Sequence, residues 1–415
     1  MQPRQAFMRI LFLNVSGELG GAERVLLGLF QGLRRQAPDM ELRLLAPAEG
    51  PFTEQARALG LAVEILPFPS ALARTGDFNL GGRKSAALTA QLKIFSLVPA
   101  SLLYAWRLRR RMAEHRSDVI HASGFKMHIL GALARPRARL LWHFHDYAGS
   151  RPLVSRLLRV LRRRCDLAVA NSASVSQDLR AIFSSRPPVQ VIHNGLDIAR
   201  FQPQGPTAGL DAAAGLPPLA PAVPRLGLVA TFARWKGHAV FMQALAQIQD
   251  LPWRAYIIGA PVYQTLGSQY SIAELRRRAE ALKLADRMGF TGACADMPAV
   301  YRALDIVIHA STQPEPFGMT ILEAMACARP VIVSYAGGAA ELIQPGVDAL
   351  AFPPGQSQAL AERLRCLLGD SELRRRLGRE ARNSGERRFA LDRMTEHFIQ
   401  AYAQLAPPRA RAAGA

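Results

Sequence analysis

Short apolar runs recur along the whole chain, separated by longer stretches of mixed, amphipathic character. In the first half they lie at residues 8–15, 41–46, 63–66, 119–122, 140–144, 167–170 and 189–193. In the second half they lie at residues 226–231, 255–258, 288–291, 305–309, 330–334 and 350–352. Continuous apolar runs of this kind are typical of strands buried on both faces, and the stretches between them are long enough for helices. The pattern predicts an α/β protein with two parallel sheets, each covered by helices on both faces.

A segment rich in Pro, Gly and Ala, residues 202–224, separates the two halves. This composition is typical of an exposed linker. At 415 residues the chain is also too long for one ordinary core and suits two domains of about 200 residues each. We therefore expect an N-terminal domain over residues 1–200, a linker over 201–224 and a C-terminal domain over 225–387.

The chain is strongly basic, since 52 Lys and Arg residues face 32 Asp and Glu residues, which gives a formal net charge of +20. Such a field attracts phosphates, anionic lipids or nucleic acids. Two clusters of arginines follow or alternate with apolar residues, at 107–116 and at 156–164. Both resemble basic amphipathic helices that lie on an anionic membrane surface. The alternative is that these arginines only solubilise the surface.

Several features limit where the protein works. No stretch of about 18 uncharged apolar residues occurs, so no membrane-spanning helix is expected. The apolar start of the chain is short and leads into glycines, so we expect a first strand and no signal peptide. The cysteines lie far apart without C-x-x-C spacing, which indicates neither a zinc site nor a disulfide framework. A cytoplasmic protein is expected.

The clearest chemical signal is an acidic pair, Glu315 and Glu323, with seven residues between them. The pair follows the predicted strand 305–309 and begins a predicted helix. In an open α/β sheet the carboxyl ends of the strands face the ligand, and the amides at the start of the next helix favour an anion. Gly318, between the two carboxylates, allows the backbone to approach a ligand closely. The alternative is that Glu315 caps the helix and Glu323 is a surface residue.

The segment 315–326, with Pro330-Val331-Ile332-Val333-Ser334 and Gly337-Gly338-Ala339-Ala340-Glu341, resembles the donor site of glycosyltransferase family 4. These are retaining enzymes of the GT-B fold, in which two Rossmann-like domains face a central cleft. The resemblance implies that Glu315 holds sugar hydroxyls, that Glu323 holds the ribose, and that the backbone near Gly292 and Ala293 recognises the base. Gly337, Gly338 and Glu341 would shape the pocket, while Phe317, Gly318, Met319 and Thr320 would act through their backbone. It also implies that a helix over 388–405 packs back on the first domain, before a flexible tail at 406–415.

Two cations follow the first strand of the second half. Family members place an Arg and a Lys here to grip the donor diphosphate, and Lys236 matches the lysine. The usual arginine position is Thr231 in this sequence, and Arg234 lies only two residues before the lysine. Arg234 either replaces the family arginine from a shifted loop or is solvated.

The first half contributes two further elements. A glycine turn with Gly20 and Gly21 follows the first strand and resembles the family loop that faces donor phosphate and acceptor; a tight strand-to-helix turn is the alternative. His145, at the carboxyl end of the strand 140–144, matches the family histidine that positions the acceptor hydroxyl or the sugar. A metal pair of His143 and His145 is the less favoured alternative, because no third ligand is evident.

Together these features predict a transferase, in which His145, Lys236 and Glu315 act at the reacting centre. It would move a sugar from a nucleotide-sugar donor to a lipid-linked or cell-surface glycan acceptor in polysaccharide biosynthesis. No D-x-D motif is present, so we expect no metal and no other cofactor. A sugar epimerase or a phosphorylase of the same fold is the alternative. A basic nucleic-acid-binding protein is the alternative from another function class, but a nucleic-acid partner is not expected, because the basic segments lack interleaved aromatics.

Overall fold

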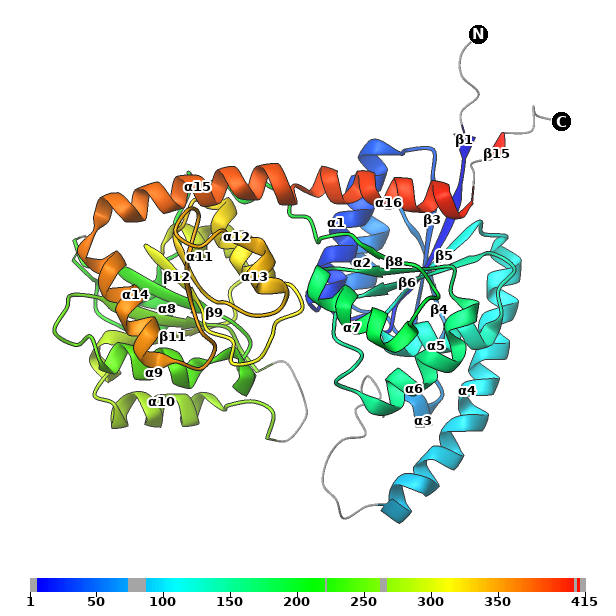
Figure 1. Ribbon diagram of the computed structural model, residues 1–415, viewed down its shortest axis with the longest axis horizontal. Helices are drawn as coiled ribbons and strands as arrows, with labels where there is room; N and C mark the ends of the chain where they lie inside the picture. The colour runs from blue at the N-terminus through cyan, green and yellow to red at the C-terminus, as the bar shows by residue number, and fades with distance from the viewer. Residues whose placement is uncertain (1–5, 74–86, 221, 262–266, 407–408, 411–415) are drawn as a thin grey trace, which may run out of the picture. The chain divides into compact units, whose positions relative to one another are not determined.

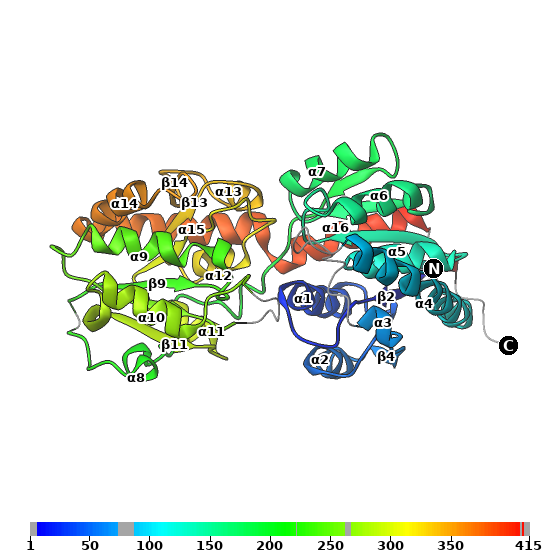
Figure 2. The ribbon, with the colours of Figure 1, turned by 90° about the horizontal axis from the view of Figure 1, so that it is seen from below.

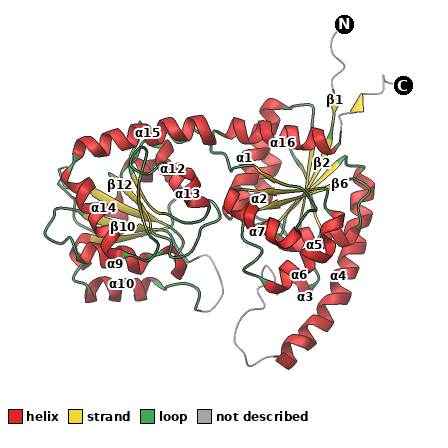
Figure 3. Ribbon diagram, viewed as in Figure 1, coloured by secondary structure: helices red, strands yellow, loops and turns green. Residues whose placement is uncertain are grey.

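The chain folds into two compact α/β units in the computed structural model, which describes residues 6–73, 87–220, 222–261, 267–406 and 409–410 (Figure 1). Unit 1 comprises Met1–Gly195 and Leu391–Ala415, and unit 2 comprises Leu196–Ala390. Each unit contains one parallel sheet with helices on both faces, which confirms the predicted class (Figure 3). None of the helices in the described ranges is both long and apolar enough to cross a membrane.

Unit 1 is built on a seven-stranded parallel sheet with the order β4-β3-β2-β5-β6-β7-β8. The strands are β2 Arg9–Leu13, β3 Glu41–Ala46, β4 Ala62–Ile65, β5 Val119–Ser123, β6 Arg139–Phe144, β7 Leu167–Ala170 and β8 Val189–Val191. The helices are α1 Gly21–Gln36, α2 Pro51–Ala58, α3 Ser70–Ala73, α4 Ala87–His115, α5 Phe125–Ala134, α6 Pro152–Leu161, α7 Ala173–Phe183 and α16 Leu391–Leu405. Strand order reverses direction at β2, where a doubly wound sheet exposes its ligand edge.

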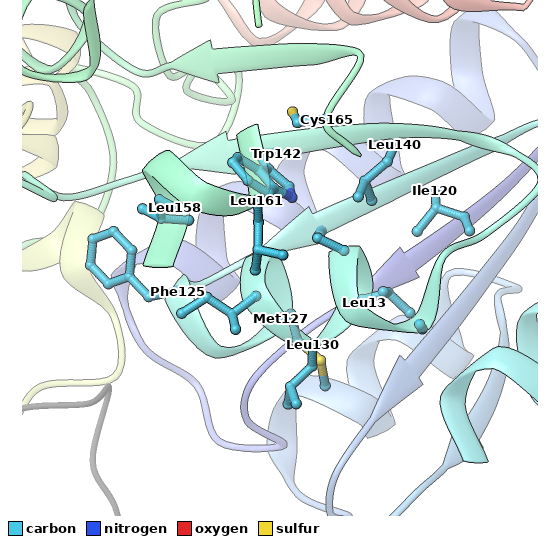
Figure 4. Packing of buried hydrophobic residues seen from close by; sticks show 14 of the residues in the cluster. Leu13, Ile120, Phe125, Met127, Leu130, Leu140, Trp142, Leu158, Leu161 and Cys165 are labelled. Carbon is cyan, nitrogen blue, oxygen red and sulfur yellow. The ribbon is translucent and has the colours of Figure 1, made fainter. Parts of the chain in front are cut away.

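The core of unit 1 explains why α5 is apolar almost all round. Side chains of β6, such as the fully buried Trp142, share one hydrophobic cluster with Phe125 and Met127 of α5 and Leu158 of α6 (Figure 4). Helix α5 contacts α4 on one side and α6 on the other, so it has little solvent-facing surface (Figure 2). A helix that is covered on several sides has no need of a polar face.

The last helix of the chain, α16, belongs to unit 1 and packs along α1. The segment expected to return, residues 388–405, divides at Ala390: Arg388 and Phe389 end helix α15 (Ser371–Phe389) of unit 2, and α16 begins at Leu391. Within the segment expected to be a flexible tail, Arg409–Ala410 (β15) pairs antiparallel with Ala6–Phe7 (β1). Residues 407–408 and 411–415 lie outside the described residues.

Unit 2 has a six-stranded parallel sheet with the order β11-β10-β9-β12-β13-β14. The strands are β9 Arg225–Val229, β10 Arg254–Ile258, β11 Met288–Gly292, β12 Ile306–His309, β13 Val331–Ser334 and β14 Leu350–Phe352. Besides α15, the helices are α8 Leu210–Ala214, α9 His238–Ala246, α10 Ile272–Ala281, α11 Met297–Arg302, α12 Met319–Ala326, α13 Gly338–Leu342 and α14 Ser357–Gly369. Every residue of β10, β12 and β13 is buried, as the continuous apolar runs require.

The expected linker at 201–224 is in part a structural element of unit 2. Phe201 and Leu210 are buried in its core, and α8 packs on β11. Asp211 of α8 accepts hydrogen bonds from Arg254 at 2.8 Å and from the Tyr256 hydroxyl at 2.6 Å, both on β10. These few buried side chains hold a segment whose overall composition indicates an exposed chain.

Candidate functional site at the carboxyl edge of the unit 2 sheet

Three neighbouring strands of unit 2 deliver their following loops to one edge of the sheet. Strands β9, β12 and β13 are adjacent and parallel, so their carboxyl ends lie together. The loops are also joined by backbone bonds: the Thr312 amide donates to the Trp235 carbonyl at 2.7 Å, and the Gly338 amide donates to the Glu315 carbonyl at 2.7 Å. The turn with Lys236, the loop with Glu315 and the start of α13 therefore form one connected edge.

Lys236 and Glu315 meet in this edge as an ion pair. Lys236 Nζ lies 2.5 Å from Glu315 Oε1, and the two side chains are only 17% and 10% exposed. The other oxygen, Oε2, accepts from His309 Nε2 at 2.8 Å and from Ser311 Oγ at 2.7 Å. The Glu315 carboxylate is thus held from two sides and fixes the position of the lysine ammonium.

The electrostatics of the pair favour an ionised carboxylate. Burial by itself raises the pKa of the Glu315 carboxyl, but the charge of Lys236 and the interactions with His309 outweigh burial and hold the pKa well below its usual range. The carboxylate is therefore ionised near pH 7. The edge carries a part-buried, oriented cation beside a buried anion.

Helix α12 begins at Met319, four residues after Glu315, and helix geometry gives the amides of Met319 and Thr320 no carbonyl partner within the helix. Gly318 precedes the helix with φ of +109°, a left-handed conformation that strains any other residue. Phe317, 3% exposed, anchors the turn by packing its ring against Phe389. Phe317 and Gly318 are buried, Met319 and Thr320 are partly exposed, and amides at the start of a helix favour a bound anion.

Glu323 lies on α12, four residues past its first residue, and is partly buried. Its Oε2 accepts a hydrogen bond of 2.7 Å from the hydroxyl of Tyr301, a fully buried side chain of α11. Burial, together with the Glu323 charge, raises the pKa of Tyr301 well above its usual value, so the phenol keeps its proton. Glu323 is therefore oriented by a neutral donor from a neighbouring helix.

The structure separates Arg234 from the lysine that follows it by two residues. Arg234 pairs with Glu274 of α10 at 2.9 Å and lies over the Tyr270 ring at 4.4 Å from its centroid. Lys236 instead points to Glu315. The Arg234 guanidinium therefore lies at the surface of α10, whereas the Lys236 ammonium lies at the carboxyl edge of the sheet.

Gly292 ends β11 and Ala293 follows it, at the same end of the sheet. The Gly292 carbonyl accepts from the Gly259 amide at 3.0 Å, which ties the loops after β10 and β11 together. A side chain added at Gly292 would meet no protein atom within 4 Å, and Ala293 is exposed. The backbone here is accessible.

In unit 1, Gly20 caps α1 and Gly21 is its first residue. The buried Glu23 holds this turn, since its carboxylate accepts from the Gly20 amide at 3.1 Å and from Asn14 Nδ2 at 3.0 Å. A Cβ at Gly20 would lie 2.6 Å from Glu23, whereas a Cβ at Gly21 would meet nothing within 4 Å. Packing within the protein therefore explains the glycine at 20 and leaves the glycine at 21 unexplained.

His145 follows β6 in unit 1, with its ring centroid 3.9 Å from that of His143. Burial lowers the pKa of His145 to about 4, so the imidazole is neutral near pH 7. No group of three or more His, Cys, Asp or Glu side chains that could hold a metal occurs within the described residues.

The sequence reasoning missed three side chains that organise this edge: His309, Ser311 and Tyr301. His309 is the last residue of a predicted strand, and a histidine ending a buried apolar run is a usable signal for a polar partner nearby. Ser311 and Tyr301 carry no such signal, because only the fold brings them to Glu315 and Glu323.

Two protein families match this chain, one in each half of it. Residues 19–200 match "Glycosyltransferase Family 4" and residues 221–384 match "Glycosyl transferases group 1". The lipopolysaccharide core biosynthesis mannosyltransferase LpcC of Rhizobium leguminosarum bv. viciae is 29% identical over 298 residues, which are 69% of this chain and 80% of that protein. The D-inositol 3-phosphate glycosyltransferase of Salinispora tropica is 29% identical over 357 residues, 78% of this chain and 70% of that protein.

Among solved structures, this chain is similar to Anabaena Alr3699/HepE in complex with UDP. The TM-score is 0.76 at 26% sequence identity, and the match covers 96% of this chain and 100% of that one. A crystal structure of the same Anabaena protein in complex with UDP-glucose matches with a TM-score of 0.74 and the same coverage.

Proposed function

Because this chain belongs to the group 1 and family 4 glycosyltransferases and has the GT-B fold, we propose that it transfers a hexose from a nucleotide-sugar donor with retention of anomeric configuration. The observation that carries the proposal is the largely buried Lys236–Glu315 pair beside the start of α12. It combines a fixed cation with helix amides, the two features that a diphosphate leaving group needs.

The leaving group is handled by the protein itself in this proposal. Lys236 and the amides that follow Gly318 offset the charge that develops on the diphosphate, without a metal ion between them. The main role of Glu315 in this proposal is to orient Lys236. Lys236, His309 and Ser311 all donate to the two carboxylate oxygens of Glu315, and the negative charge of Glu315 keeps the lysine ammonium in place. The sugar hydroxyls that Glu315 accepts would lie beside this pair.

UDP-hexoses are the first donors to consider, because Anabaena Alr3699/HepE was solved with UDP and with UDP-glucose. GDP-sugars follow, since a mannosyltransferase is among the relatives. Glu323, oriented by Tyr301, would accept the ribose hydroxyls, and the accessible backbone at Gly292 and Ala293 would contact the base.

Unit 1 binds the acceptor in this proposal. The Gly20–Gly21 turn at the start of α1 would meet the donor phosphates and the acceptor, and the unfilled space at Gly21 supports a close ligand. His145, neutral near pH 7, would hydrogen-bond the acceptor hydroxyl or the sugar. We assign the acceptor to lipid-linked or cell-surface glycans built at the cytoplasmic face of a membrane.

Donor binding is tested by measuring thermal shifts of the purified full chain with a panel of UDP- and GDP-sugars. A donor at 100 times its Kd should stabilise the protein by about 2.7 kcal/mol. Lys236→Met should abolish the shift, while Arg234→Met, which alters a neighbouring cation outside the edge, should largely keep it. If no nucleotide sugar shifts the midpoint, or if both variants behave alike, the donor-site assignment is wrong.

Product analysis tests the reaction class. The expected products are free nucleoside diphosphate and a glycoside with the donor's anomeric configuration, and their yield should be unchanged by a chelator. An epimerised sugar nucleotide, or a sugar 1-phosphate formed from phosphate and glycan, would instead assign the chain to the epimerases or phosphorylases of this fold.

A further inference from the structure

Helix α4 of unit 1 has two faces of different character. One face is buried in the core and includes Leu97, Tyr104, Leu108 and Met112. The Tyr104 hydroxyl also donates to the Leu66 carbonyl at 3.2 Å, which fixes the rotation of the helix about its axis. The opposite face therefore has a defined orientation toward the outside of unit 1.

That opposite face is apolar where a surface helix is normally polar. Val98, Leu102, Leu103 and Trp106 are 53%, 57%, 46% and 55% exposed. Their spacing of three and four residues places them in one strip along the helix. They are four of the eight large apolar side chains that the described part of the chain exposes, and the other four are scattered. An apolar strip of this kind indicates a contact surface.

Arginines continue the strip in the next turns of α4. Arg107, Arg109 and Arg110 are exposed, and Arg110 lies over the Trp106 ring at 5.1 Å from its centroid. Within the described residues none of the three has a carboxylate partner, whereas Arg111 pairs with Glu64. The sequence contains no Asp or Glu between Asp77 and Glu114. The strip thus ends in cations that are not neutralised by neighbouring acids.

Helix α6, the other basic amphipathic segment of the sequence, differs from α4. Its Leu158 and Leu161 are buried in the core of unit 1, so most of the leucine stripe that gave it an amphipathic pattern is already covered by protein. Only Val160 remains as a strongly exposed apolar residue, at 77%. Of the two segments, α4 alone offers an apolar surface together with cations.

We propose that the strip Val98–Trp106 of α4 and the adjoining arginines dock unit 1 on the surface of an anionic lipid bilayer. Apolar side chains would enter the boundary between headgroups and acyl chains, Trp106 would lie at the headgroup level, and the arginines would contact lipid phosphates. This inference gives the proposed membrane location a specific surface, and it does not depend on the donor chemistry.

Charge and apolar complementarity favour an anionic bilayer over a second copy of the chain or a nucleic acid as the partner of this surface. Two copies of the chain meeting through α4 would bring their unpaired arginines together, which is unfavourable. A nucleic acid would satisfy the arginines but leave the aliphatic residues Val98, Leu102 and Leu103 without an apolar partner. A bilayer with anionic headgroups satisfies both parts of the surface.

The test is flotation of the full chain with vesicles of phosphatidylcholine and phosphatidylglycerol in about a 2:1 ratio, compared with phosphatidylcholine alone. Binding is expected only to the anionic vesicles. Leu102→Gln with Trp106→Gln should weaken it by at least about 10-fold. Arg107→Gln, Arg109→Gln and Arg110→Gln together should weaken it on the order of 100-fold, because each basic residue near an anionic surface contributes about a factor of five.

Matched controls come from unit 2. Ile272→Gln with Val347→Gln removes exposed apolar residues from elsewhere, and Arg276→Gln, Arg277→Gln and Arg376→Gln removes the same number of exposed cations. Both controls should keep vesicle binding within about twofold if α4 is the contact. Nucleotide-sugar thermal shifts should be the same in all of these proteins, so loss of vesicle binding is distinguishable from loss of donor binding or of folding.

A third variant reports directly on insertion. Trp106→Phe should keep vesicle binding but lose the quenching of tryptophan fluorescence by brominated lipids. Of the other three tryptophans, Trp142 and Trp253 are buried in the two cores, and the partly exposed Trp235 belongs to unit 2, whereas α4 belongs to unit 1. Absence of binding by the wild type, binding that the α4 variants retain in full, or a dimer that the Leu102/Trp106 variant dissociates would each overturn the proposal.

Discussion

At the scale of single residues, the carboxylate of Glu315 connects the groups that the donor site needs. It accepts hydrogen bonds from Lys236, His309 and Ser311, and its backbone carbonyl is bound by the Gly338 amide. Lys236 and Gly338 come from other loops, whereas His309 and Ser311 lie just before Glu315 in the same segment. The position of the ammonium therefore depends on several side chains that would never touch a donor.

A double-mutant cycle measures how strongly the buried pair is coupled. Glu315→Leu and Lys236→Met should each lower the stability of unit 2 by about 3 kcal/mol, because each removes one partner of a largely buried ion pair. The double variant should cost clearly less than the sum. The measurement is the urea midpoint of unit 2. The exposed pair Arg365–Asp250, 43% and 59% exposed, is the control and should show a coupling below about 1 kcal/mol. Additive costs at the buried pair would contradict the coupling.

Tyr301 should affect donor binding through Glu323. Tyr301→Phe removes the hydroxyl that orients this carboxylate and should weaken nucleotide-sugar binding about 5- to 10-fold, which corresponds to one hydrogen bond. Tyr256→Phe is a matched control, since this buried hydroxyl also donates to a carboxylate, Asp211, at 2.6 Å. Both variants should lose a similar stability, but only Tyr301→Phe should raise the Kd measured by titration calorimetry. Equal Kd values would remove Tyr301 from the site.

At the scale of elements, helices α1 and α16 approach each other through glycines. A Cβ at Gly32 would lie 2.0 Å from Thr395 Oγ1, and one at Gly28 would lie 3.2 Å from the Leu391 side chain. The two helices can pack this closely only because α1 has no side chain at these points.

Gly32→Ala should therefore destabilise unit 1 by about 2–3 kcal/mol, in spite of the better helix propensity of Ala. Thermal unfolding measures the loss, and adding Thr395→Ala should recover part of it. Gly369→Ala is the control, because a Cβ there meets no atom within 4 Å and should be neutral or slightly stabilising. A neutral Gly32→Ala would show that α16 can shift without cost.

The sequence predicts the strands better than it predicts the segments between the sheets. Buried parallel strands must be apolar on both faces, so runs such as 119–122 and 305–309 are unambiguous. Helix α8 is not predicted, because the buried Leu210 and the part-buried Asp211 are isolated within a Pro- and Gly-rich segment. At the candidate site, Lys236 and Glu315 are found from motifs, but their contact with each other is a property of the fold.

At the scale of the whole molecule, the two units should respond differently to acid. Burial lowers the pKa of His128 to about 3 and that of His145 to about 4. Burial, together with the charges of neighbouring histidines, also lowers the pKa of His121 and His143 well below the usual value. All four lie in unit 1, whereas unit 2 has His238, whose pKa burial lowers to about 4.

The sign of the effect follows from proton binding. Well above pH 6.5 these imidazoles are neutral in both the folded and the unfolded chain, and stability does not depend on pH through them. Between pH 6.5 and about 4 the unfolded chain binds protons that the folded chain does not, so stability falls as the pH falls, on the order of 3 kcal/mol for a fully buried histidine. Calorimetric scans should show the midpoint of unit 1 falling more steeply than that of unit 2. His128→Leu should reduce the slope, and parallel slopes for the two units would contradict the assignment.

The membership of α16 in unit 1 has a consequence for how the protein is made. The His121 ring of β5 hydrogen-bonds the hydroxyl of Tyr402 at 2.7 Å, so a residue near the carboxyl end of the chain completes a core whose strands are synthesised first. On the ribosome, the first unit would emerge with its α1 surface uncovered and would remain incomplete throughout synthesis of the second. Premature termination anywhere before α16 would thus release an unfinished first unit, and nascent chains would depend on chaperones for that interval.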